Sequence, residues 1–255
     1  MNHLIKIVNF YKIKKESDVK AIKYYFDMID KNYFIYHSRI VKTSNFYFIF
    51  FKKTLKKINY CPICIDNIYN NKYLKIIPIY LYNRYFFIQP SYKQYINMHL
   101  VIIDLIHIPH EINENTINYL FSFIEQFPSF FICANTNLKN IGGSVNEHLH
   151  YQAGISDMPL FHKDASLIED DIYLVDWYLT TYLIKSSDKE LIKEKYNHLL
   201  SKHQDEFTSF NPILFSRNEI YYLYLILRCA EEINQHLVYK DFKEGKQLKI
   251  YIWNS

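Results

Sequence analysis

The chain has 255 residues, of which 49% are hydrophobic and 18% aromatic, so one large domain or two small ones can bury a sizeable core. The net charge of +4 is mild, and the densest basic cluster, Lys52-Lys53 with Lys56-Lys57, is more typical of a solvated face than of a nucleic-acid patch. No apolar run reaches the roughly 18 residues of a membrane span, so neither nucleic acid nor a membrane is the expected partner.

The first residues, Met1-Asn2-His3-Leu4, lack the apolar region of a secretory signal, so we expect a cytoplasmic protein. In that compartment the four cysteines favour metal binding over disulfides. Only four of the 30 basic residues are arginines, and these positions stand out because an arginine side chain can bind phosphate through two parallel hydrogen bonds. They are Arg39, Arg84, Arg217 and Arg228.

Residues 1–60 carry no pattern that indicates chemistry. Ser17 can cap a helix over residues 18–30, and Phe46 to Phe51 is typical of a buried strand.

The next segment contains the motif Cys61-Pro62-Ile63-Cys64. Its spacing lets two thiolates bind one tetrahedral metal ion, and proline stiffens the turn between them. The motif alone is half a site. Two buried cysteines or a redox pair remain alternatives, although no thioredoxin-like context surrounds the motif.

Three strands and a helix are predicted next. Two strands flank Tyr82-Asn83-Arg84 within residues 74–89, and a third covers Met98 to Asp104. Helical apolar spacing over residues 115–127 ends at Pro128, and Phe130 to Asn135 forms a further strand. His107 can complete a metal site with the two cysteines, whereas His99 and His110 are interpreted as ordinary loop histidines.

Three of the four glycines lie in one stretch, Gly142 to Gly154. Glycine is needed where the backbone takes a positive φ or approaches a ligand closely. The stretch contains a His-x-His-x-Gln repeat with the strand period of two, so His148, His150 and Gln152 should share one strand face. On a helix the two histidines would lie about 200° apart. We therefore expect a glycine-lined turn that leads into a short strand.

Cys61, Cys64, His107 and His148 together make a Cys2His2 zinc set, in which every ligand position of a structural zinc is filled. His150 then has another task, about 7 Å further along the strand, where it can face a substrate.

The C-terminal part is predicted to begin with helices over residues 164–185 and 188–203, because both segments carry helical apolar spacing. Ile213–Phe215 and Tyr221–Arg228 indicate a hairpin. Residues 230–240 are expected to be helical, and Leu248–Trp253 to form a last strand.

Many short motifs lie between Cys61 and Pro159. They are Cys61-Pro62-Ile63-Cys64-Ile65-Asp66-Asn67, Ile77-Pro78, Phe86-Phe87-Ile88-Gln89, Tyr95 with Asn97 and His99, His107 with Pro109, Phe127 to Asn135, the Gly-Gly-Ser-x-x-x-His-x-His-x-Gln-x-Gly signature, and Met158-Pro159. In order and spacing these motifs, with a weaker continuation over Pro212–Arg228, resemble the galactose-1-phosphate uridylyltransferases of low-GC bacteria, within the histidine-triad and uridylyltransferase-like superfamily.

This resemblance implies an α+β, histidine-triad-like fold, with a mostly antiparallel half-barrel sheet and helices mainly on one face. It implies that His150 attacks the α-phosphorus of UDP-glucose and forms a uridylyl-histidine. Galactose 1-phosphate then takes the uridylyl group from His150, and Gln152 donates a hydrogen bond to the phosphate. Nucleotide sugar and sugar phosphate are the implied substrates, zinc the implied structural cofactor, and a homodimer is among the arrangements it allows. The implied substrate-binding residues are Asn135, Gly142, Gly143, Ser144, Gln152, Arg217 and Arg228.

The resemblance also suggests one unit over residues 1–255, with residues 1–60 of open role, a catalytic core over 61–160 and a second, degenerate half over 161–255. Members of the class are longer on both sides. Phe207-Thr208 stands where a His-Asn pair is expected, and Phe215 where an arginine is expected. Two alternatives therefore stand beside uridylyl transfer: a nucleotide-sugar or dinucleotide phosphorylase or hydrolase, and a zinc-containing nucleotide-binding protein without turnover.

Overall fold

The computed structural model describes residues 23, 39–42, 47–51, 61–65, 76–91, 96–138, 145–155, 157–203, 205, 207–229 and 247–250. Several predictions fall outside these residues: most of the helix over 18–30 with its cap Ser17, the turn residues Gly142, Gly143 and Ser144, the helix over 230–240, and the end of the last strand beyond Ile250.

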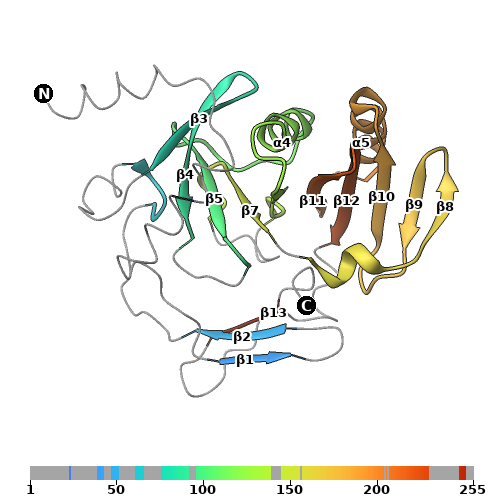
Figure 1. Ribbon diagram of the computed structural model, residues 1–255, viewed down its shortest axis with the longest axis horizontal. Helices are drawn as coiled ribbons and strands as arrows, with labels where there is room; N and C mark the ends of the chain where they lie inside the picture. Colours follow the sequence, from blue (N-terminus) through green and yellow to red (C-terminus); the bar gives the residue numbers. More distant parts are fainter. Residues whose placement is uncertain are drawn as a thin grey trace, which may run out of the picture.

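The main body is a ten-stranded sheet of order β3-β4-β5-β7-β6-β11-β12-β10-β9-β8, in which all neighbouring strands are antiparallel. Its strands are β3 (Ile77–Leu81), β4 (Arg84–Pro90), β5 (Leu100–Asp104), β6 (Phe131–Cys133), β7 (His150–Gly154), β8 (Ala165–Glu169), β9 (Ile172–Val175), β10 (Thr181–Ser186), β11 (Thr208–Arg217) and β12 (Ile220–Cys229). A second sheet joins β1 (Arg39–Lys42), β2 (Tyr47–Phe51) and β13 (Gln247–Ile250), and Figure 1 shows it on the other side of the large sheet from the helices.

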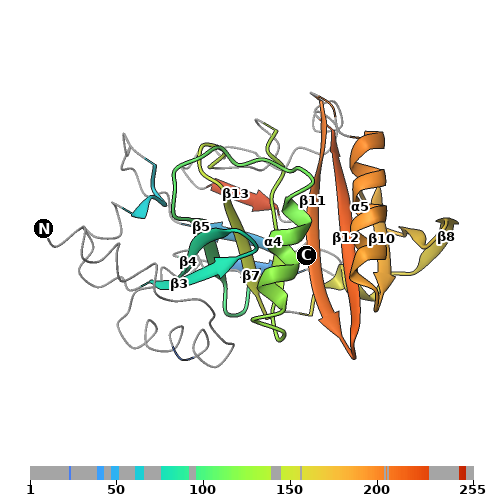
Figure 2. The same cartoon turned by 90° about the horizontal axis from the view of Figure 1, so that it is seen from above.

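Two helices, α4 (Thr116–Ile124) and α5 (Lys189–His203), lie on the same face of the large sheet (Figure 1). Their apolar stripes meet the inward residues of the strands in one core cluster, which includes Leu120, Tyr196 and Leu225. α4 packs on β6 and β11, and α5 on β10 and β11, so the helices run side by side along the strands (Figure 2). The predicted fold class is confirmed: the sheet is mostly antiparallel and open, with helices on one face.

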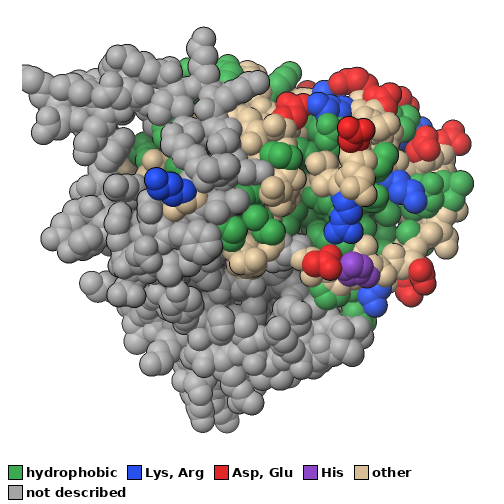
Figure 3. Space-filling model, in the orientation of Figure 1, with side chains coloured by type: hydrophobic (Ala, Val, Ile, Leu, Met, Phe, Trp, Pro, Cys, Tyr) green, Lys and Arg blue, Asp and Glu red, His purple; other side chains and the backbone are tan. Residues whose placement is uncertain are grey.

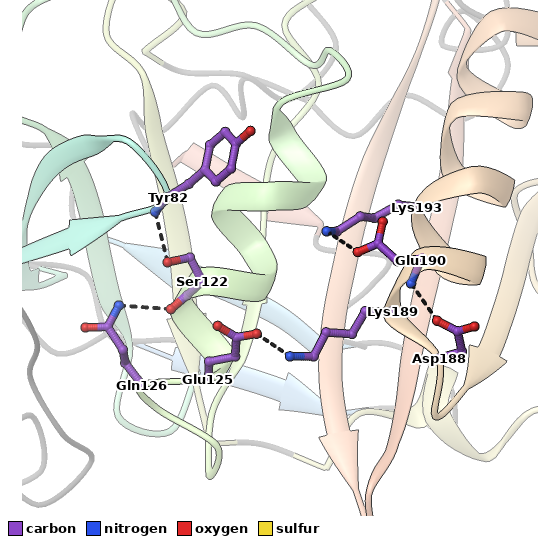
Figure 4. Close-up of polar contacts among 8 residues, drawn as sticks. All are labelled: Tyr82, Ser122, Glu125, Gln126, Asp188, Lys189, Glu190 and Lys193. Carbon is purple, nitrogen blue, oxygen red and sulfur yellow. Dashed lines mark hydrogen bonds and ion pairs between the residues drawn. The ribbon is translucent and has the colours of Figure 1, made fainter.

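Polar contacts fasten α4 to both of its neighbours (Figure 4). The Ser122 hydroxyl accepts a hydrogen bond from the backbone N–H of Tyr82 at 2.9 Å, in the β3–β4 turn. On the other side, Glu125 at the end of α4 forms an ion pair with Lys189 at the start of α5. These contacts are exposed, so they orient the helices, while the buried stripe supplies most of the stability.

The predicted helix over residues 164–185 is wrong. These residues form β8, β9 and β10, and β10 pairs with β12 along its whole length. Asp170 and Asp171 make the β8–β9 turn, and Asp171 has a φ of 58°, a conformation that aspartate tolerates better than most residues. Short apolar runs fit both periodicities, and here pairing with the sheet decided the outcome. The predicted helix over 188–203 is confirmed as α5, and the predicted hairpin is confirmed as the antiparallel pair of β11 and β12.

Lys, Arg, Asp and Glu side chains are mixed over the α5 and β8–β9 end of the molecule (Figure 3). Glu169, at the end of β8, pairs with His198 at 3.0 Å and with Lys202 at 3.7 Å, both on α5. Among the residues that the structure describes, no helix combines the length and the apolar character needed to cross a membrane.

Gly154 ends β7 at a place where residues 96–97 lie close against its backbone. A Cβ at this position would lie 2.3 Å from Cγ2 of Ile96 and 2.9 Å from the carbonyl oxygen of Asn97. We therefore expect Gly154→Ala to lower the free energy of unfolding by about 1–3 kcal/mol, measured by urea denaturation. The double variant with Ile96→Ala should lose less than the sum of the two single changes, and strict additivity would contradict this steric account.

Candidate metal centre and active site

The Cys61–Cys64 segment is held against the sheet face opposite the helices. Ile63 and Ile65 pack against Phe87 of β4 and Ile103 of β5, where the four side chains exclude water. Ile63 and Ile65, on either side of Cys64, are thus the apolar anchors of this segment.

The structure places the four predicted metal ligands, Cys61, Cys64, His107 and His148, together. Their donor atoms all lie within 4.8 Å of one another. Nδ1 of His148 is 3.4 Å from both Sγ atoms, and Nδ1 of His107 is 2.9 Å from Sγ of Cys64. Ligands around a tetrahedral zinc at about 2.0–2.3 Å would be roughly 3.5 Å apart, so the donor set and its spacing fit this metal.

The orientation of the His148 ring also fits metal binding. Its Nε2 donates to the carbonyl oxygen of Asp104 at 2.9 Å, and since a carbonyl can only accept, Nε2 carries the proton. Nδ1 therefore presents its lone pair toward the two sulfur atoms. Burial lowers the pKa of His148, which keeps the ring in the neutral form that a metal requires.

Asp104 itself is fixed by a partly buried ion pair. Nε of Arg84 donates to Oδ2 of Asp104 at 2.6 Å, and Oδ1 accepts the backbone N–H of Ile106 at 2.7 Å. The hydrogen bond to Asp104 raises the pKa of Arg84. This pair shapes the loop between β5 and His107, and it thereby places both the carbonyl that orients His148 and the His107 ligand.

We expect Arg84→Met to lower the free energy of unfolding by about 2–3 kcal/mol, because it leaves the Asp104 carboxylate buried without its cation. Asp104 is 1% exposed and Arg84 29% exposed. The matched control is Lys193→Met, which removes a more exposed pair with Glu190 and should change stability by at most about 0.5 kcal/mol. Equal urea midpoints for the two variants would contradict the role of the Arg84–Asp104 pair.

His150 and Gln152 lie side by side on the sheet face opposite the helices. They stand across from Ile103 and Val101 of β5, whereas the alternate residue Tyr151 is buried in the core under α4. His150 is 9% exposed and Gln152 8% exposed. β7 begins at His150, so His148 precedes the strand and turns toward the cysteines instead of continuing the row.

The His150 ring is held in one tautomer. Its Nδ1 donates to the carbonyl oxygen of His148 at 2.7 Å, which leaves the lone pair on Nε2. Burial, and then the neighbouring His110, lower the pKa of His150 to about 3, so the ring is neutral. A neutral imidazole with an unprotonated Nε2 is a competent nucleophile.

Two histidines interpreted as loop residues lie buried beside this pair. His99 is 1% exposed and its Nε2 lies 2.9 Å from Oε1 of Gln152. His110 is 3% exposed, and its ring is 5.1 Å from that of His150. The interpretation of both as ordinary loop histidines is therefore wrong. His99 precedes Val101 and Ile103 with strand period, and this alternation was the signal that could have placed it on the His150 face.

The other predicted substrate-binding residues divide into two groups. Continuing the β6–β7 register brings Asn135 opposite His150, and Arg228, 9% exposed, pairs with Ser209 at the same end of the β11–β12 hairpin. Arg217 lies at the other end of β11, eight residues beyond Ser209, about 27 Å away along the strand. There it contacts Asp157 at 3.8 Å and Phe215. The structure thus brings Asn135 and Arg228 to the His150 end, but not Arg217.

A pocket of about 330 Å³ lies at this distal end, lined by Phe131, Gly154, Phe161, Phe215 and Arg217 among others. Buried apolar residues of the same sheet face, including Ile96, Cys133 and Ile213, form a packed cluster between β6 and β12. His150 and Gln152 do not line this pocket.

The curated relatives of this chain include several galactose-1-phosphate uridylyltransferases. The chain is 30% identical over 158 residues to a galactose-1-phosphate uridylyltransferase of Caldanaerobacter subterraneus subsp. tengcongensis, covering 55% of this chain and 30% of the relative. It is 27% identical over 188 residues to that of Bacillus subtilis (64% and 36%), and 25% over 282 residues to that of Ligilactobacillus salivarius (88% and 56%). No family model matches the chain.

The chain spans about a third to a half of the length of these curated relatives. Among solved structures, yeast Ap4A phosphorylase Apa2 in complex with AMP matches with a TM-score of 0.54 and 11% identity, covering 84% of this chain and 80% of that one. This likeness shows the fold. The resemblance is confirmed: the chain is a divergent relative of the galactose-1-phosphate uridylyltransferases.

Proposed function

We propose that this chain transfers a nucleoside monophosphate through a covalent intermediate on His150, with uridylyl transfer between UDP-glucose and galactose 1-phosphate as its reaction. The observation that carries the proposal is the hydrogen bond from Nδ1 of His150 to the carbonyl of His148, which leaves the lone pair on Nε2 as the group that can attack phosphorus. The similarity to galactose-1-phosphate uridylyltransferases supports the nucleotide sugar and the sugar phosphate as substrates.

In the first step, Nε2 of His150 attacks the α-phosphorus of UDP-glucose. The N–P bond forms, the bond between the α-phosphorus and the bridging oxygen breaks, and glucose 1-phosphate leaves with the bond's electron pair. In the second step, a phosphate oxygen of galactose 1-phosphate attacks the same phosphorus, so that the N–P bond breaks and His150 returns to its neutral form. The covalent intermediate thus divides the transfer into two substitutions at phosphorus, in which the imidazole is first the nucleophile and then the leaving group.

Gln152 is proposed to stabilise the phosphate oxygens while charge develops. His99 donates from Nε2 to Oε1 of Gln152, which fixes the amide so that its nitrogen is the donor end. Hydrogen-bond donors placed beforehand around a developing oxyanion contribute strongly to catalysis. Asn135 and Arg228 are proposed substrate contacts at the same end of the sheet. The backbone N–H groups of Gly142, Gly143 and Ser144, which lie outside the described residues, remain proposed substrate contacts from the sequence. Arg217 stays a prediction that the geometry does not support.

Zinc is the proposed metal of the Cys61, Cys64, His107 and His148 set, because two thiolates and two imidazoles at tetrahedral spacing suit it. When bound, it would cross-link the cysteine segment, the loop after β5 and the start of β7, with all four positions filled by protein. Bound zinc would therefore have a structural role, in which the four residues hold the start of the nucleophile strand in place.

The proposed division of the chain follows the sheet. Five strands, β3 to β7, and the helix α4 belong to the proposed catalytic half at 61–160, and five further strands with α5 belong to the second half at 161–255. The halves meet where β6 pairs with β11. The second half extends the sheet and contributes Arg228 to the site.

Phosphorolysis of a dinucleotide is a second candidate. The chain covers 80% of the Ap4A phosphorylase with the same fold but only 30–56% of the three uridylyltransferases described above. In this reaction inorganic phosphate would take the place of the sugar phosphate in the second step, while the His150 step is unchanged.

Product analysis with different acceptors separates these reactions. Wild-type protein is incubated with UDP-glucose and, in parallel, galactose 1-phosphate, inorganic phosphate or buffer alone, and the nucleotide products are separated by chromatography. We expect UDP-galactose in the first reaction. UDP formed only with inorganic phosphate would instead identify a phosphorylase, and UMP in all three reactions a hydrolase. The same series with Ap4A tests the second candidate directly.

A further inference from the structure

His110 is a buried imidazole for which the proposed reaction has no chemical role. It follows the proline of the loop that carries His107, and it reaches the place where two strands of the sheet part. Its Nε2 lies 2.8 Å from the carbonyl oxygen of Asn135, just beyond β6. Its Nδ1 lies 3.5 Å from the backbone nitrogen of His150, the first residue of β7.

These two contacts occupy the position of a missing ladder bond. β6 and β7 pair in register from Phe131 and Gly154 up to Cys133 and Gln152. One more rung would bring the backbone N–H of His150 against the carbonyl of Asn135. Instead, the His110 ring stands between them, so that the N–H of His150 points to Nδ1 and Nε2–H donates to Asn135.

The hydrogen-bond roles follow from the partners. A carbonyl can only accept, so Nε2 of His110 carries the proton and Nδ1 presents its lone pair to the N–H of His150. Burial lowers the pKa of His110, which favours this neutral form. The centroid of the ring lies 5.1 Å from that of the His150 ring, with the two planes tilted by 42°, and the His110 backbone N–H donates to the carbonyl of Asn146 at 3.0 Å.

We propose that His110 is a positioning residue, an imidazole inserted between β6 and β7 that spreads the two strands at the end of the ladder and fixes the backbone and ring of His150 for attack. This inference rests on the proposed function of His150. His110 touches no reacting atom in the proposed steps. Its effect is geometric, and a displacement of the nucleophile by about 1 Å can reduce a rate by about 100-fold.

The test compares His110→Phe with His110→Gln in the zinc-loaded full chain. Phenylalanine keeps a ring beside His150 but makes neither hydrogen bond, whereas the glutamine amide can donate to Asn135 and accept from the N–H of His150. We expect the rate of adduct formation from UDP-glucose to fall roughly 10- to 100-fold in His110→Phe, with little change in KM, and His110→Gln to recover most of it. Zinc content and melting temperature are measured for each variant.

Two outcomes would overturn the inference. One is a wild-type rate in His110→Phe. The other is equal loss in both variants in proportion to lost zinc or lost stability, since that would show a structural role only. Hydrogen exchange of the His150 backbone N–H tests the contact with the His110 ring without turnover. This exchange should be faster in His110→Phe than in His110→Gln. If the wild type forms no adduct, the proposed function fails and this exchange result alone decides the inference.

Discussion

Replacing His150 with alanine is expected to abolish nucleotidyl transfer. Without the imidazole no N–P bond can form, and the remaining groups cannot supply the covalent step. Exchange of labelled glucose 1-phosphate into UDP-glucose, with no acceptor added, isolates this step. We expect its rate to fall by at least roughly 10⁴-fold, the size of effect seen when a nucleophile is removed.

The control for this variant is His162→Ala. His162 is an exposed histidine that pairs with Asp157 at 2.8 Å and does not line the His150 site, so its variant should exchange label at the wild-type rate. Both proteins should also retain zinc and melt close to the wild type. Exchange in His150→Ala at a rate near that of His162→Ala would show that another group is the nucleophile.

Replacing Cys61 with serine is expected to release the metal and destabilise the fold. Structural zinc contributes its binding free energy to folding, and removal of one thiolate from a closed four-ligand site forfeits much of it. We expect zinc to fall from near one per chain to a small fraction. A loss of several kcal/mol would lower the melting temperature by roughly 10 °C, since about 1 kcal/mol corresponds to about 2–4 °C at this size.

Cys229→Ser is the matched control. Cys229 ends β12, is a free and half-buried cysteine, and lies outside the four-ligand cluster. Its replacement should change neither zinc content nor melting temperature. Full zinc and full stability in Cys61→Ser would refute the metal assignment, and a chelator that leaves wild-type stability unchanged would do the same.

The ligand set could be predicted because cysteine and histidine are recognisable as metal ligands from residue type and spacing alone. Two cysteines with two residues between them, and histidines that alternate with an apolar residue, restrict the geometry before any fold is known. The structure places Cys61, Cys64, His107 and His148 together, although up to 87 residues separate them along the chain. The two histidines of His-x-His also take different positions, because His148 faces the thiols and His150 lies on the strand.

The features that the sequence alone did not predict depend on pairing between strands that are distant along the chain. Residues 164–185 carry apolar spacing that suits a helix, but β10 is a strand because β12 offers it a partner along its whole length. His99 and His110 lie in short segments whose burial depends on strands up to 53 residues away. Arg217 fits a phosphate-binding role by residue type, yet the length of β11 puts it far from His150.

The most direct test of the account is the intact mass of the zinc-loaded protein after incubation with UDP-glucose. We predict a mass increase of one uridylyl group on the wild type, none on His150→Ala, and loss of the adduct when galactose 1-phosphate is added. That result would establish the nucleophile, the nucleotide and the two-step mechanism together. An adduct of the same size on His150→Ala, or transfer to galactose 1-phosphate without any covalent intermediate in rapid-quench samples, would contradict it.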